Sequence, residues 1–348
     1  MQKARLSLKE SPQSDLVKRC REGGVTLVLG SGISAQRGLP SWEGLAQHLW
    51  QAAFPKRSSP WAQDAGTKSP REVPQFLPIV FELAHRELGE KHFVDVLRAK
   101  LYENAQFPVR NPNFGESRES LAVLGRLVVQ EFKRGGRRRI EAIVTLNADD
   151  LLEQAVFVLL GNQRWGGNVV RSYARSTGRR LGMAGLRPIP IYHIHGFVPA
   201  NIEGLYGKWP WRFPRFFDHN LVFTDLQYWS TAASPLTFAN RVVSWMLSET
   251  RCMFVGLSMT DINLLRWLAL RTLELQGDTE QVECFAKTRL LQDMGLSSSW
   301  HLWIRPANDD RTGFLSEFLA LRGIQSLEIK DWAGAGFSRL IAQCFPAS

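Results

Sequence analysis

The most constraining feature of the sequence is a short apolar run that leads directly into a glycine-rich turn. Residues 25–29 (VTLVL) have the length and composition of a buried strand, and Gly30, Ser31, Gly32 and Ser34 follow at once. Such a turn leaves backbone N–H groups free to face a phosphate, and glycine allows a ligand to approach closely. The segment therefore predicts a dinucleotide or phosphate site at the edge of a parallel sheet.

The turn departs from the usual dinucleotide-binding pattern. Ala35 stands where a third glycine is due, and no clear second strand ends in an acidic residue roughly 20 residues further on. A tight strand-to-helix turn that is merely rich in glycine is therefore an alternative. Beyond the turn, residues 38–42 predict an ordered loop, with Ser41 as a candidate N-cap for the helix that follows.

Alternating apolar patterns predict the fold class. Further strands are expected at residues 140–146, 188–194, 252–255, 302–304 and 326–329, and helices at 42–54, 76–88, 91–101, 120–132, 149–160, 234–248, 261–275 and 309–321. This order predicts an α/β fold with a Rossmann-like parallel sheet covered by helices on both faces. We expect an N-terminal arm over residues 1–22 and a single domain over 23–348, with a helical insertion at about 55–135.

Composition is that of an ordinary globular protein. The 348 residues are 44% hydrophobic and 22% charged, with neither a membrane-length apolar run nor the apolar core of a signal peptide. We therefore expect a cytoplasmic protein without a membrane segment. The cysteines are widely scattered and are expected to be core or incidental thiols, which argues against a zinc module. They are Cys20, Cys252, Cys284 and Cys344.

A formal net charge of +10 is concentrated in two places, residues 133–139 and 171–187. These basic loops could bind nucleic acid or an acidic partner, but neither carries the interleaved aromatic residues of a base-stacking platform. Solvated loops are the plainer interpretation. The aromatic residues of 209–217 either pack beneath an insertion or form an oligomer or partner interface.

Four positions that could contact a ligand each follow directly on a predicted strand. They are Gly30, Asn147, His195 and Gly256. Because ligands of open α/β sheets bind at the carboxyl ends of the strands, we expect these positions to converge on one site.

The polar residues near this edge also have structural interpretations. Asn147 and Asp149 could cap a helix, although an amide can instead hold a ribose hydroxyl or a water. His193 and His195 could be hydrogen-bonded core histidines, or a metal pair for which no third ligand is evident. Asp261 is either a helix cap or a ribose ligand, with the cap favoured.

Four segments, in this order, resemble the motifs of sirtuins. They read GSGISAQRGLPSW at 30–42, TLNAD at 145–149, HIHG at 193–196 and GLSMTD at 256–261. The Pro-x-Trp ending of the first segment resembles a branch of bacterial sirtuin-like proteins associated with defence. Residues 224–229 (TDLQYW) resemble another segment of that branch, with packing as the plain interpretation of its role.

The resemblance implies NAD as substrate and no metal. The pyrophosphate would lie on residues 30–34, and residues 39–42 would cover the nicotinamide. Asn147 would position the ribose and a water, and His195 would act as the base. Asp149 matches a more structural position. The other implied contacts are Leu39, Pro40 and Trp42 at the nicotinamide end, and Gly256, Ser258 and Asp261 on the adenosine side.

The resemblance further implies a function. Similar bacterial proteins deplete NAD in antiphage defence, so we expect an NAD hydrolase that releases nicotinamide and ADP-ribose. An NAD-dependent protein deacylase and a non-enzymatic NAD or ADP-ribose sensor are the alternatives, and a nucleic-acid binder is a weaker one. We expect a homo-oligomer and a separate sensor or activator, such as a HerA-type ATPase or an Argonaute-like protein, through which nucleic acid would act only indirectly.

Overall fold

Seven parallel strands form one sheet in the order β3-β4-β2-β1-β5-β6-β7. The computed structural model describes residues 12–58, 73–134, 138–161, 169–174, 188–200, 221–282, 301–307 and 310–347. The strands are β1 (Val25–Leu29), β2 (Ile140–Thr145), β3 (Val170–Tyr173), β4 (Ile189–His193), β5 (Arg251–Val255), β6 (His301–Pro306) and β7 (Ile324–Ile329). The expected α/β fold with a Rossmann-like parallel sheet is confirmed.

Strand β1 lies at the centre of the sheet, between β2 and β5. All five of its residues are buried, as expected of a parallel strand that is covered on both faces. Leu29 lies opposite both Thr145 and Val255, and Thr145 lies opposite His193. The loops that follow β1, β2, β4 and β5 therefore all begin at the same edge of the sheet.

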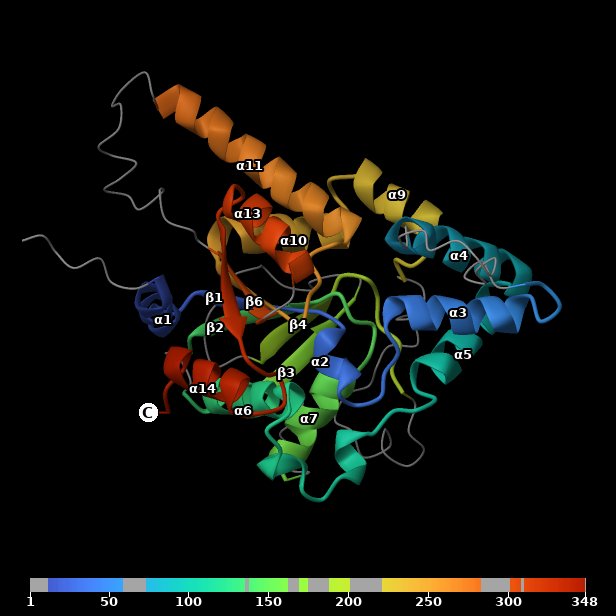
Figure 1. Cartoon of the computed structure of the whole chain (residues 1–348), viewed down its shortest axis with the longest axis horizontal. Coiled ribbons are helices and arrows are strands. Elements are labelled where there is room, and N and C mark those ends of the chain that lie inside the picture. The colour runs from blue at the N-terminus through green and yellow to red at the C-terminus, as the bar shows by residue number, and fades with distance from the viewer. Residues whose placement is uncertain are drawn as a thin grey trace, which may run out of the picture.

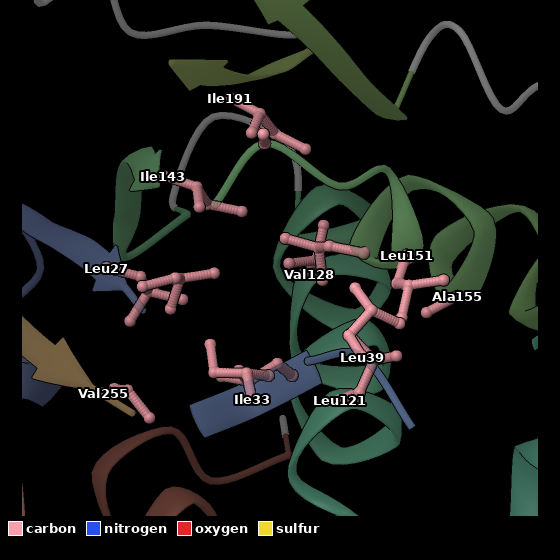
Figure 2. Close-up of a cluster of buried hydrophobic side chains, with 14 of the residues drawn as sticks. Leu27, Ile33, Leu39, Leu121, Val128, Ile143, Leu151, Ala155, Ile191 and Val255 are labelled. Atoms are coloured by element: carbon pink, nitrogen blue, oxygen red, sulfur yellow. The ribbon is translucent and has the colours of Figure 1, made fainter. Parts of the chain in front are cut away.

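Helices cover both faces (Figure 1). Side chains on one face of β1, such as Leu27, pack with α6 (Ser120–Lys133), α7 (Leu151–Leu159) and α14 (Ala335–Cys344). Val28, on the other face, packs with α10 (Phe238–Glu249), α11 (Ile262–Val282) and α13 (Asp310–Ala320). Figure 2 shows the first of these cores, with Leu27, Ile143 and Ile191 from the strands facing Val128 of α6.

The order in which successive strands are added to the sheet reverses beside β1. After β1 it builds one half of the sheet, through β2, β3 and β4, and then returns as β5 on the other side of β1. In open α/β sheets such a switch point creates the crevice in which ligands bind. Here the strand order reverses between β1 and β5.

Further helices gather beside this edge (Figure 1). They are α2 (Gly32–Ala35), α3 (Trp42–Ala53), α4 (Val73–Leu88), α5 (Glu90–Leu101) and α9 (Asp225–Ala233), with short 3-10 turns η1 (Pro108–Arg110) and η2 (Phe114–Glu116). Helix α3 packs on α4 and α5, and α9 packs on α4. Of the predicted insertion at about 55–135, α6 lies directly on the sheet, whereas α4 and α5 pack around α3. The division into an arm and one domain stays a prediction.

Helix α1 (Pro12–Glu22) packs against α14. Cys20 and Cys344 are buried where these two helices meet, and a hydrogen bond between the thiols raises the pKa of Cys20. Cys252 is buried within β5, and burial raises the pKa of its thiol to about 12. These three cysteines are therefore core thiols, while Cys284 lies outside the described residues.

Several elements differ from the sequence expectation. Strand β3 and the helices α9 and α14 were not predicted. Helix α9 begins at Asp225 because Thr224 and Gln227 form a complete capping box there. The expected helix over 234–248 begins later, at Phe238.

The first basic cluster is partly structural. The side chain of Arg139 is buried and pairs with Glu131, while Arg134 donates to the carbonyl of Pro346 over 2.8 Å. These two cations are thus engaged within the protein. Most of the second cluster, residues 175–187, lies outside the described residues, as do the aromatic residues of 209–217.

The loop after α2 is anchored to the segment before α6. Arg37 is buried, with its Nε 2.6 Å from Glu119 Oε2 and its guanidinium 4.7 Å from the centre of the Phe114 ring. Gly38 follows with φ of +80°, packed against the backbone of Asn104. These contacts fix the course of the chain toward α3.

Replacing Gly38 by alanine should destabilise the protein strongly. The new Cβ would clash with the Asn104 carbonyl oxygen at a positive φ, so we expect a loss of at least about 3 kcal/mol in the free energy of unfolding. Gly323→Ala is the matched control, because φ is +73° there but an added Cβ meets no atom within 4 Å. It should cost only about 1 kcal/mol. Equal losses in urea unfolding would contradict the packing of this loop.

Candidate functional site

The glycines after β1 and β5 pack backbone against backbone. Gly30 N donates to Val255 O over 3.0 Å, and Gly32 N donates to Gly256 O over 2.9 Å. A Cβ added to Gly32 would lie 2.9 Å from the Gly256 oxygen, and Gly256 itself has φ of +68°. The expectation of free N–H groups at Gly30 and Gly32 thus does not hold, because the neighbouring loop occupies both. Their contact with a phosphate stays a prediction.

Asn147 lies just beyond β2 and is held by the loop after β1. Its Nδ2 donates to Gly30 O over 3.0 Å, and its backbone N donates to Thr145 Oγ1 over 3.0 Å. The bond to a carbonyl oxygen fixes which end of the amide is the nitrogen. The Oδ1 is buried and has no hydrogen-bond partner among the described residues. This acceptor is therefore available to a ligand.

Asp149 joins the same group of side chains. Ser34 Oγ donates to Asp149 Oδ2 over 2.9 Å, and Leu151 N donates to Asp149 Oδ1 over 3.0 Å. Asp149 thus receives an N–H group of α7, as a capping residue does. Burial, with a contribution from the nearby carboxylates of Asp150 and Glu153, raises the pKa of Asp149 to about 6.

A second layer of buried polar groups supports Asn147 from behind. His193 contacts the backbone oxygen of Asn147 through Nδ1 at 3.2 Å and Glu153 Oε1 through Nε2 at 2.8 Å. Asp150 accepts hydrogen bonds from Tyr102 Oη and Gln154 Nε2, each over 3.0 Å. His193 is accordingly a hydrogen-bonded core histidine.

Two members of this layer were missed by sequence reasoning. Glu153 carried a signal, since it is a charged residue in a helix whose other residues are mostly apolar. Tyr102 carried none, because its contact with Asp150 joins segments 48 residues apart.

A pocket opens beside Asn147. Seven of the predicted site residues line it, together with four that were not predicted. The predicted ones are Ser31, Ser34, Leu39, Pro40, Trp42, Asn147 and Asp149, and the others are Leu45, Leu101, Ala148 and Phe223. Ser41 Oγ accepts from Gly44 N over 3.1 Å, so the predicted cap of α3 is present and places Trp42 at the pocket wall.

His195 lies next to this wall but does not line the pocket. Strand β4 ends at His193, so His195 is on a turn, with its ring 6.0 Å from that of Trp42 and 5.6 Å from that of Tyr228. Its side chain is 2% exposed, and neither ring nitrogen has a hydrogen-bond partner of good geometry among the described residues. Burial lowers the pKa of His195, while Asp261 and the backbone of Leu146 oppose that shift.

The loop after β5 places its two predicted polar residues differently. Ser258 is exposed, and its Oγ lies 2.7 Å from Thr260 Oγ1. Asp261 Oδ1 accepts from Leu264 N over 2.8 Å and so caps α11, while its Oδ2 lies 3.8 Å from His195 Nε2. The structure therefore brings Asp261 to His195 and leaves Ser258 at the surface.

Residues 141–290 match the family model described as SIR2-like domain. The match supports a sirtuin-like family and indicates an NAD-related activity, and it includes Asn147, His195 and residues 256–261. None of the curated proteins compared with the chain matches it. Within the described ranges, no three or more His, Cys, Asp or Glu side chains are grouped as metal ligands, and no helix is long and apolar enough to cross a membrane.

The raised pKa of Asp149 predicts a pH-dependent effect of Asp149→Asn on stability. The folded carboxyl has a pKa of about 6 and the unfolded one about 3.9, so folding binds protons between these values and stability falls as pH rises through them. The asparagine side chain can still accept a hydrogen bond from Leu151 N, but it carries no charge. Relative to wild type, the variant should gain on the order of 2–3 kcal/mol in the free energy of unfolding between pH 4 and pH 7. A difference that does not change with pH would contradict the shift.

Proposed function

We propose that this protein hydrolyses NAD to nicotinamide and ADP-ribose. The observation that carries the proposal is the pocket at the carboxyl edge of the sheet: Asn147 lines it with a buried Oδ1 that no described residue satisfies, and His195 lies beside its Trp42 wall. Buried polar atoms normally have partners, so an open acceptor on the wall of a pocket favours a bound ligand there. The match to the SIR2-like domain supports NAD as that ligand.

The reaction needs a site that tolerates positive charge. The bond between ribose C1′ and the nicotinamide nitrogen breaks, its electron pair leaves with nicotinamide, and positive charge develops on the ribose. The oxygen dipole of Asn147 and the carboxyl of Asp149 line the pocket and are suited to this charge. The oxygen of a water then bonds to C1′.

The water must lose a proton as it reacts. Because burial lowers the pKa of His195, its imidazole is mostly neutral at pH 7 and can accept that proton. Asn147 Oδ1 can accept a hydrogen bond from the ribose or from the water, since Gly30 O already holds the amide nitrogen. One proton is released for each NAD that is hydrolysed.

NAD cleavage should require both residues. Purified wild-type protein should release nicotinamide and ADP-ribose, measured by chromatography, while Asn147→Ala and His195→Ala should each lose at least about 100-fold in rate. The matched controls are Asn113→Ala and His92→Ala, because both side chains are exposed and lie outside the site. They should retain the wild-type rate. Cleavage that survives in either site variant would remove that residue from the proposed mechanism.

The same experiment separates the alternatives. An NAD-dependent deacylase would turn over NAD only with an acyl-lysine peptide, and the nicotinamide released would match the peptide deacylated. A non-enzymatic sensor would bind NAD or ADP-ribose without product. The direct nucleic-acid alternative requires DNA binding that weakens steeply with salt. The described Arg134 and Arg139 are already paired within the protein, which disfavours it.

We also propose that the protein is the NAD-depleting effector of a bacterial antiphage system in the cytoplasm. The support is the resemblance of residues 38–42 to the defence-associated branch. A free enzyme that consumes NAD would harm its host, so a silent state and an activator are expected. The activator proposed is a separate sensor such as a HerA-type ATPase or an Argonaute-like protein, with nucleic acid acting only through it.

Activation should be visible in the concentration dependence of cleavage. If homo-oligomerisation switches the enzyme on, the rate per subunit should rise with protein concentration, in parallel with the mass measured by light scattering. If a partner does so, the rate should stay low at every concentration and rise when the co-expressed ATPase or Argonaute-like protein is added. A constant rate per subunit at full activity would contradict both modes of control.

A further inference from the structure

The segment 224–229 has no role in the function proposed so far, although several hydrogen bonds fix its position. Gln227 Oε1 accepts from Phe223 N over 2.9 Å and from Thr224 N over 3.0 Å, which completes the capping box of α9. Glu82 of α4 bonds the Thr224 side chain and the backbone of Leu226. These contacts fix the start of α9, and with it the position of Tyr228.

Tyr228 points its hydroxyl at the carboxylate of Asp261. The Oη donates to Asp261 Oδ2 over 3.0 Å, while Asp261 Oδ1 accepts from Leu264 N over 2.8 Å. Burial, and then Asp261 itself, raises the pKa of Tyr228 well above its usual value, so the hydroxyl remains a donor at physiological pH. The carboxylate is thus held at both oxygens, by α9 and by the start of α11.

The carboxylate held in this way faces His195. Its Oδ2 lies 3.8 Å from His195 Nε2, close enough to pair with a protonated ring. The Asp261 side chain is 18% exposed, whereas that of His195 is 2% exposed. Asp261 therefore lies between a buried imidazole and solvent.

We propose that Asp261, held by Tyr228, is a positioning residue that stabilises the protonated form of His195 and opens a route for its proton to solvent. The inference rests on the proposed hydrolysis of NAD. As the water oxygen bonds to C1′, its O–H bond breaks and the proton moves to the His195 ring. The imidazolium then pairs with the Asp261 carboxylate, and the proton passes to bulk water, so that the ring returns to its neutral form.

The groups around His195 agree with this assignment. Trp42 of α3 brings no charge, and Tyr228 of α9 is neutral. Arg266 of α11 lies within the field of Asp261, but its guanidinium donates to Ala232 O and Asn240 Oδ1. Asp261 is therefore the carboxylate that opposes the effect of burial on His195.

The test is the pH profile of kcat/KM for Asp261→Asn. Asparagine can still cap α11 at Leu264 N, but it removes the charge that favours protonated His195. We expect kcat to fall at least about tenfold and the acidic limb of the profile to move to lower pH by on the order of one unit. A fall in kcat with the acidic limb unmoved would overturn the proposal, because that is the effect of a structural role.

Two further variants sharpen the test. Tyr228→Phe frees one carboxylate oxygen but keeps the charge, so kcat should fall several-fold while the acidic limb does not move to lower pH. Asp225→Asn makes the same charge change in the first turn of α9, where no contact with His195 is formed. Its kcat and the acidic limb of its profile should match those of wild type. If the acidic limb of Asp225→Asn moves as far as that of Asp261→Asn, the shift reflects a general effect of charge, and the proposal is overturned.

A second readout needs no turnover. The chain has seven histidines, and the NMR signal of His195 can be assigned by its loss in His195→Gln. In the protein without NAD, Asp261→Asn should lower the pKa of His195 by on the order of one unit. An unchanged pKa would sink the pairing of these residues. If the pKa moves and no NAD is cleaved, the pairing stands and the proposed function fails.

Discussion

The site depends on the close approach of two backbone turns at the centre of the sheet. Gly30 and Gly32 after β1 lie against Gly256 after β5, and the hydrogen bonds between these loops draw them together. Glycine is required because a Cβ on any of the three would come within 3.0 Å of an atom of the opposing loop. Asn147 Nδ2 donates to Gly30 O, and this hydrogen bond holds the loop after β2 against the same two turns. The N–H groups of Gly30 and Gly32 are already used inside the protein, so these glycines have a packing role of their own.

The polar groups behind the pocket are costly to bury, and they are arranged so that most are satisfied. Three buried carboxylates, those of Asp149, Asp150 and Glu153, lie at the start of α7. A serine, a tyrosine and a histidine bond them in turn, which offsets their desolvation. Asn147 Oδ1, Gln154 Oε1 and the His195 nitrogens lack such partners among the described residues. Of these residues, Asn147 lines the pocket, and this position of an open acceptor favours a ligand there.

Local sequence patterns predicted most of the helices and strands. The features that were not predicted depend largely on contacts between residues far apart in the sequence. The β1 bounds and the Ser41 cap follow from a fully buried apolar run and from one hydroxyl beside a helix start. Strand β3 was missed because it is short and largely uncovered, so its sequence lacks an apolar pattern. The convergence of Asn147 with the β1 turn was predictable from parallel topology. The contacts of Tyr102 and Tyr228 were not, since each joins residues at least 33 positions apart through a single hydroxyl.

Topology also explains why the matched segment cannot form the site alone. Residues 141–290 hold Asn147, His195 and Asp261, but β1 inserts between β2 and β5 and pairs with both. Without β1 these two strands would lose their shared neighbour. The pocket would lose Ser31, Ser34 and the loop to Trp42, which form much of its wall. Trp42 meets the His195 ring edge-on, so the N-terminal segment also shapes the surroundings of the proposed base. The pocket beside Asn147 is therefore built from both halves of the chain.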